Sequence, residues 1–290
     1  MVIHYNEFHT SLWERRSAVP LRGRRRAEGT PPTMLTLKLI MTPLLIASVT
    51  LVGRRWGPGV SGWLMGFPLI SGPVSVFLAL QYGRAFAARA AVGTLGGQAS
   101  VCVFCLGYCL VSRKAGWPVS AVAAIAAFFA ATFLWNAASL PLLPTTAIDV
   151  LVVVLVLLLI PRRPAPAGAP TTPRWDIPAR MLVATAFVVG LTTFAANLGP
   201  QLSGLLSPFP TFSTVIAVFT HHQMGADSAS QLLRGVVLGT FSFLCFFLVV
   251  ALLLPLAPMF WTYLSATAAS IGVNSLALRF VQRTGQPIPG

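Results

Sequence analysis

Acidic residues are scarce in this chain of 290 residues, which holds 6 aspartates and glutamates against 20 lysines and arginines. Charged residues of both signs make up 9% of the chain, whereas a soluble domain carries about 25%. Hydrophobic residues reach 56%, and the mean hydropathy is +0.78. The chain has too few charged residues to form a surface that faces water. The sequence therefore predicts an integral membrane protein that contacts the lipid bilayer.

After residue 33, the acidic residues are Asp149, Asp176 and Asp227. We place Asp149 at the edge of an apolar segment, Asp176 in a linker and Asp227 in a loop. None of the three is therefore expected near the middle of the membrane. Proton-coupled exchangers often use a carboxylate inside a span as the relay. The sequence thus argues against a cation antiporter that depends on a membrane carboxylate.

Residues that carry chemistry are also few, with 4 cysteines and 4 histidines. Three cysteines, at 102, 105 and 109, lie in one apolar stretch without a neighbouring His or carboxylate, so we interpret them as small packing residues. His221 and His222 are adjacent and point to different faces of a helix, which makes them poor co-ligands. We predict no catalytic residue, no metal and no cofactor, and a membrane-embedded enzyme is the weakest class. The net charge of +14 forms no basic stripe, which argues against nucleic-acid binding.

Nine segments are long and apolar enough to cross a bilayer as helices. They cover residues 35–53, 58–81, 90–112, 117–139, 146–161, 180–197, 201–220, 232–255 and 258–278. A stretch rich in proline and arginine, residues 161–178, follows the fifth segment and is typical of an extended linker. The predicted fold class is therefore all-α, a polytopic membrane protein.

The second half of the chain repeats the first. Residues 57–83 align with residues 199–225 without a gap, at an offset of 142, and 12 of the 27 positions are identical. The shared core is Gly-Pro-x2-Ser-Gly-x-Leu-x2-Phe-Pro-x2-Ser. Gly93 and Gly97 continue the match at Gly235 and Gly239, and Gln98 aligns with Thr240. An internal repeat of this length indicates a duplicated structural unit.

The number of spans predicts that the second copy is inverted. Spans one to four match spans six to nine, and the fifth is unmatched, so it carries the chain across the membrane before the second copy begins. The prediction is an inverted 4+1+4 repeat. The domains are a leader (1–33) that is disordered or not native, a first repeat (34–139), a linker helix with a cytoplasmic loop (140–179), a second repeat (180–279) and a tail (280–290).

The arginines and lysines set the orientation, because they are enriched in cytoplasmic loops. After residue 33, most of them follow spans one, three, five, seven and nine, so we predict a multi-pass protein of the bacterial inner membrane with a cytoplasmic C-terminus. Six arginines before Met34 conflict with this orientation, which is why the leader is suspected not to be native. Arg234 is expected to reach phosphate headgroups.

Paired, proline-interrupted spans in two inverted halves indicate where a transporter binds its solute. Proline in a span frees a backbone carbonyl, and the freed group has to be satisfied by neighbours or face a polar cavity. The candidate substrate-binding residues are Pro68, Ser71, Asn136, Pro210, Ser213 and Asn274. The alternative interpretation is that these residues form kinks and helix contacts without a ligand, and the two asparagines serve to hold helices together.

The runs LSGLLSPFPTFSTVIAVF (202–219) and LLRGVVLGTFSFLCFFL (232–248) resemble the small bacterial membrane proteins of the GlpM family. The first repeat is similar only through Phe67 and Pro68. The resemblance implies a four-span unit of about 100 residues and a link to alginate production, but it implies no reaction.

Two functions remain open from the sequence. The first is a secondary transporter of a small solute, with its site at the interface of the repeats. The second is a membrane partner or scaffold that transports nothing and serves a cell-envelope polysaccharide system. Either function is compatible with a homo-oligomer.

Overall fold

The computed structural model describes residues 32–69, 71–138, 140–160, 175–198 and 209–283. The chain forms two units, residues 1–35 and 36–290, and the features below belong to the second. The predicted leader and most of the Pro/Arg-rich linker lie outside the described residues. Within the described residues all regular structure is helical, as the composition predicted.

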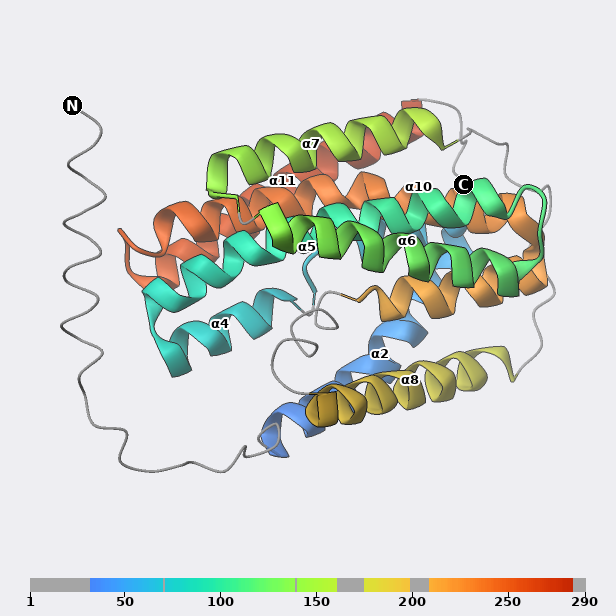
Figure 1. The fold of residues 1–290 in the computed structure, drawn as a ribbon, viewed down its shortest axis with the longest axis horizontal. Helices are drawn as coiled ribbons and strands as arrows, with labels where there is room; N and C mark the ends of the chain where they lie inside the picture. Colours follow the sequence, from blue (N-terminus) through green and yellow to red (C-terminus); the bar gives the residue numbers. More distant parts are fainter. Residues whose placement is uncertain (1–31, 70, 139, 161–174, 199–208, 284–290) are drawn as a thin grey trace. The chain divides into compact units, whose positions relative to one another are not determined.

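Nine helical elements follow one another along the described chain (Figure 1). They are α2 (Pro32–Trp56), α3 (Pro58–Met65), α4 (Ser71–Tyr82), α5 (Arg84–Val111), α6 (Trp117–Ala138), α7 (Leu142–Leu159), α8 (Asp176–Leu198), α10 (Thr211–Leu253) and α11 (Met259–Arg283). Each predicted span coincides with one of these helices or with part of one, except for two spans. The second, 58–81, covers α3, α4 and the break between them, and residues 201–208 of the seventh lie outside the described residues.

Four helices of the described chain are long and apolar enough to cross a membrane: α5, α6, α7 and α10. Their outer surfaces carry large apolar side chains, such as Val122 and Phe133 on α6 and Leu143 and Leu158 on α7, each more than two-thirds exposed. In water such a surface would be costly, whereas in a bilayer it faces hydrocarbon. The membrane assignment therefore has structural support, while the count of nine spans stays a prediction.

The predicted break in the second span is confirmed. Helix α3 ends at Met65 and α4 begins at Ser71, so the residues around Pro68 are not helical. In the second repeat Pro210 precedes the first residue of α10, Thr211. Proline cannot donate a backbone hydrogen bond, and its ring excludes the preceding helical turn, so both copies have a helix start just after this residue.

Among the residues that the structure describes, three glycines adopt a positive φ, a conformation that residues with a side chain rarely take. Gly83, between α4 and α5, has φ 87° and ψ 163°, and Gly225, inside α10, has φ 86° and ψ 172°. These two residues are equivalent in the repeat. Gly225 thus divides α10 into two helical segments, 211–224 and 226–253, and the chain reverses between them (Figure 1).

The same picture shows that the two reversals lie at opposite ends of the helices. The junction of α4 and α5 is at the left of Figure 1, whereas the two segments of α10 join at the right. The loop predicted around Asp227 is wrong, because the chain returns to helix directly after Gly225. A single glycine with a positive φ is sufficient to reverse the chain here, so a longer loop is not needed.

Helix α3 packs directly against the second segment of α10. A Cβ atom on Gly62 would overlap the Leu232 carbonyl, and one on Gly235 would overlap the Gly59 carbonyl. Gly66 lies equally close to Gly239. The pairs 62/66 and 235/239 each have the Gly-x3-Gly spacing that allows helix backbones to meet in a membrane. This contact joins the first half of the chain to the second.

Candidate functional site

The described residues enclose a large cavity between the two halves. Its volume is about 860 Å³, within the range of about 300–1,000 Å³ that small-molecule sites occupy. Its walls come from α2, the break between α3 and α4, α5, the end of α6 and the start of α10. Its described lining carries no charged side chain and is mainly apolar, with a few hydroxyl and amide groups.

Four of the six predicted site residues line this cavity: Ser71, Asn136, Pro210 and Ser213. Ser71 is the first residue of α4, and Ser213 lies in the first turn of α10, where it is buried. The structure therefore brings the two proline-interrupted segments to one space. Asn136 reaches it from the last turn of α6.

The other two predicted residues, Pro68 and Asn274, are not among the lining residues. Pro68 is buried in the break, and its carbonyl accepts the Gly72 amide at 2.9 Å. Asn274 is buried on α11, where its backbone carbonyl accepts the Trp63 indole N–H at 3.2 Å. Its side-chain oxygen has no hydrogen-bond partner in the described chain. These two residues position helices around the cavity instead of contacting its contents.

Phe209 fixes the break of the second repeat. Its ring stacks on Phe129 with centroids 5.9 Å apart, meets the Phe128 ring edge-on at 5.4 Å and packs against Phe187 at 5.6 Å. Such aromatic contacts stabilise beyond the area they bury. The Phe-Pro pair thus anchors the start of α10 between α6 and α8.

Two hydroxyls in the cavity wall are buried without a partner. Ser100 on α5 is 1% exposed and Thr132 on α6 is 4% exposed, and neither side-chain oxygen has a hydrogen-bond partner in the described residues. Leaving a buried polar group unsatisfied costs about 1–3 kcal/mol. Both residues line the cavity, but protein atoms cover their hydroxyl oxygens in this conformation. Sequence reasoning missed both, since single hydroxyls in apolar helices are common.

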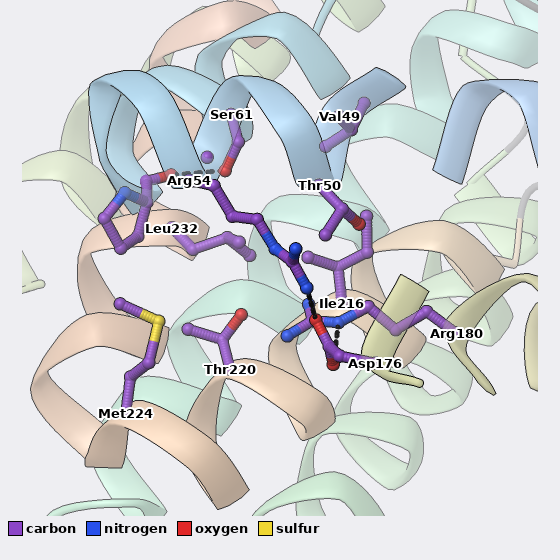
Figure 2. Close-up of a pocket in the computed structure, with 12 residues that line it drawn as sticks. Val49, Thr50, Arg54, Ser61, Asp176, Arg180, Ile216, Thr220, Met224 and Leu232 are labelled. Atoms are coloured by element: carbon purple, nitrogen blue, oxygen red, sulfur yellow. Dashed lines mark hydrogen bonds and ion pairs between the residues drawn. The ribbon is translucent and has the colours of Figure 1, made fainter. Parts of the chain in front are cut away.

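A second, smaller site lies beside the cavity and is shown in Figure 2. Arg54, at the end of α2, donates to the Asp176 carboxylate at 2.9 Å, and Arg180 donates to the other oxygen of the same carboxylate at 2.8 Å. Gln223 of α10 donates to Asp176 and accepts from Arg180. We call these four residues the polar cluster. It joins α2 of the first half to α8 and α10 of the second.

The Asp176 carboxyl is charged in this arrangement. Burial alone would raise its pKa, but the hydrogen bonds from Arg180, Gln223 and Arg54 outweigh burial and hold the pKa below the ordinary value of aspartate. Its side chain is fully buried at the start of α8, before the predicted sixth span. The sequence placed Asp176 in the linker, and the structure corrects this assignment.

The space at the polar cluster is about 30 Å³, roughly the volume of one water. It is therefore too small for a solute. Val49 and Ile216 line both this space and the large cavity, so these two side chains separate them. The polar cluster links the two halves by hydrogen bonds and ion pairs next to the cavity wall. The large cavity is the candidate binding site.

Asp149 is the clearest departure from the sequence prediction. It lies in the middle of α7, not at its edge, and it is fully buried. It belongs to the buried face of that helix, with Thr145, Val153 and Val156. The spacing of these four residues fits one helix face and was available from the sequence. The buried face was not recognised from the sequence because the segment consists almost entirely of Val, Leu and Ile.

Other residues differ in detail from the sequence prediction. Arg234 does not reach outward to headgroups, because its guanidinium donates to the Leu157 and Ile160 carbonyls at 2.6 and 3.0 Å and caps the end of α7. His221 lies within α10, and its ring meets the Tyr108 hydroxyl at 3.2 Å. The cysteines at 102, 105 and 109 are buried and form no disulfide in the described chain, and their role as packing residues stays a prediction.

Comparison of the chain with protein-family models, with curated proteins and with solved structures finds no match. The resemblance to the GlpM family stays a prediction from the two sequence runs that carry it. The functional argument therefore rests on the cavity and on the residues around it.

Proposed function

We propose that this protein is a secondary transporter of a small solute, which binds in the cavity of about 860 Å³ between the two halves. One observation carries the proposal: the proline-interrupted segments of both repeats contribute Ser71 and Ser213 to the same cavity. Discontinuous helices whose ends meet at a central site are typical of secondary transporters.

The inverted 4+1+4 repeat is part of this proposal. Gly83 and Gly225 are equivalent residues with nearly the same backbone angles, and the reversals at these points lie at opposite ends of the helices (Figure 1). Gln98 and Thr240, also equivalent, contact each other. Two copies related by a two-fold axis in the membrane plane would bring equivalent residues together near that axis, which these observations favour.

The chemistry of the cavity favours a solute without net charge. The described lining offers serine, threonine, asparagine and glutamine side chains among apolar ones, and no arginine, lysine or carboxylate. A charged solute would lose its hydration there without an opposite charge in return. We therefore propose a small, partly apolar molecule with hydroxyl or carbonyl groups that pair with polar side chains of the lining, such as Ser71, Asn136 and Ser213.

Ligand-dependent thermal stabilisation of the purified full chain in detergent tests this proposal, since a ligand that binds only the folded state raises the melting temperature. A panel of small uncharged solutes should contain members that stabilise the wild type. Replacing both Ser71 and Ser213 by Phe should abolish the shift, because the two rings would occupy the cavity. Ser275→Ala, at an exposed position of α11, is the control that should keep it.

The competing function is a membrane scaffold of an envelope polysaccharide system. A scaffold would give no solute-dependent shift with any member of the panel and would co-purify with one fixed partner. That pair of results would overturn the transport proposal. The volume of the cavity and the presence of both proline-interrupted segments in its wall favour transport over the scaffold, because a scaffold requires no space for a solute between its halves.

A further inference from the structure

Asp149 combines three properties that together set it apart from the other buried carboxylate of the described chain, Asp176. Its side chain is fully buried, it lies in the middle of an apolar helix, and neither carboxyl oxygen has a hydrogen-bond partner in the described chain. Asp176 shows the contrast within the same molecule, since three side chains donate to it. A buried charge without a partner costs far more than a buried neutral group. In this conformation Asp149 therefore carries a proton.

The neighbouring helices supply no counter-ion. Helix α7 packs against α5 and α10. Arg234 of α10 is bound to carbonyls at the end of α7, eight residues beyond Asp149 and so about 12 Å along the helix. The other titratable or charged groups described on α5 and α10 are Arg84, Arg89, Cys102, Cys105, Tyr108, Cys109, His221, His222, Asp227 and Cys245. Among these groups, the Cys102 thiol of α5 is near enough to Asp149 for the two groups to interact if they are charged.

Polar side chains lead from this thiol to the cavity. The Cys102 thiol donates to the Thr240 hydroxyl at 3.9 Å, and the Gln98 amide donates to the same hydroxyl at 3.0 Å. Gln98 lines the cavity. The hydrogen-bonded side chains of Cys102, Thr240 and Gln98 thus connect the surroundings of Asp149 with the solute site, although Asp149 itself bonds to none of them.

We propose that Asp149 is the proton-binding site that couples this cavity to the proton gradient, an inference that rests on the proposed transport function. The proton adds to the carboxylate in one conformation and leaves from it in another. Because the conformation described here excludes the unpaired carboxylate, loss of the proton shifts the protein to a state in which water or a cation reaches Asp149. Intramembrane carboxylates that bind and release protons in this way drive many transporters.

Infrared spectroscopy of the purified full chain in lipid vesicles, without solute, tests the proton site directly. Wild-type protein should show the C=O band of a protonated carboxyl, which disappears as the pH is raised. Tryptophan fluorescence should change over the same pH range, since Trp135 lines the cavity. Asp149→Asn should lose both the band and the fluorescence change. Asp149→Glu should keep both, with the pH midpoint displaced.

Val153→Ala is the matched control, because it alters the same buried face of α7 one turn away and leaves the carboxyl in place. It should behave as the wild type. The inference is overturned if Asp149→Asn keeps the wild-type band and transition. It is also overturned if the wild-type band never titrates, since Asp149 would then be a permanently neutral packing residue. Solute-induced thermal stabilisation at one fixed pH is independent of these readouts, so a failed proton site and a failed solute site give different results.

Discussion

Gln98 of α5 donates its side-chain amide to the hydroxyl of Thr240 on α10 at 3.0 Å, and the two residues are separated by 142 positions, the offset that aligns the two repeats. Equivalent residues of a duplicated protein meet only where the copies face each other. The contact also lies on the line of polar groups between Asp149 and the cavity. Its loss should therefore affect both the joining of the halves and the coupling of protons.

Thr240→Val is expected to leave the buried Gln98 amide without its acceptor and to cost about 1–3 kcal/mol of stability. Gln98→Leu together with Thr240→Val should cost less than the sum of the single variants, because neither partner is then unsatisfied. Thermal unfolding of the four proteins in detergent measures the coupling. Additive losses would mean that the two side chains do not interact.

Gly62→Ala and Gly235→Ala should each prevent the close contact of α3 with α10, since either methyl group would overlap a backbone carbonyl. Losses of about 2 kcal/mol or more are expected, because backbone cannot move aside as a flexible side chain does. Gly93→Ala is the control, with open space around its Cβ position. The melting temperature and the yield of monodisperse protein report the effect, and equal values for all three variants would contradict the packing.

Ser100→Ala and Thr132→Val remove hydroxyls that have no partner in the described chain. We expect the solute-free protein to gain up to about 1 kcal/mol, because a buried unsatisfied group disappears and the shape of the wall is nearly kept. Solute-dependent stabilisation should change little, because protein atoms cover both hydroxyl oxygens in this conformation. A loss of stability without solute would instead indicate a structural role.

Asp176 should make the protein sensitive to acid. Its folded pKa lies below its unfolded value of about 3.9, so it contributes stability that is fully present above that value. The contribution is lost as the pH falls through the folded pKa. At neutral pH, Asp176→Asn should lower the melting temperature by several degrees, because Arg180 then lies buried without its counter-ion.

Melting curves from pH 7 to pH 3 check this sign. The wild type and Asp176→Asn should differ most at neutral pH and converge as the acid limit is approached. Asp227→Asn provides a comparison at another aspartate of the chain, outside the polar cluster. A difference between wild type and Asp176→Asn that grows on acidification would contradict the network described for Asp176.

The helices were predictable because hydropathy reports burial in lipid, and the proline break was predictable because Pro68 removes a backbone donor from the span. The single-residue reversal at Gly225 was not, since a glycine in a sequence does not reveal its φ angle. Asp149 and Arg234 were misjudged for a related reason. The acceptors of Arg234 lie on another helix, and Asp149 faces the interior of the bundle without a partner in the described chain. The direction in which either side chain points depends on packing that one segment does not encode. Ser71 and Ser213 were found because the duplication drew attention to them.

Access to the cavity from the two sides of the membrane tests the central claim most directly. Ser213→Cys, in a chain whose four native cysteines are replaced, would be treated in oriented vesicles with a thiol reagent that cannot cross the bilayer. A transporter should let the reagent reach position 213 from one side at acidic pH and from the other side at alkaline pH. Reaction from a single side, or from neither, under every condition would contradict a transport site in this cavity.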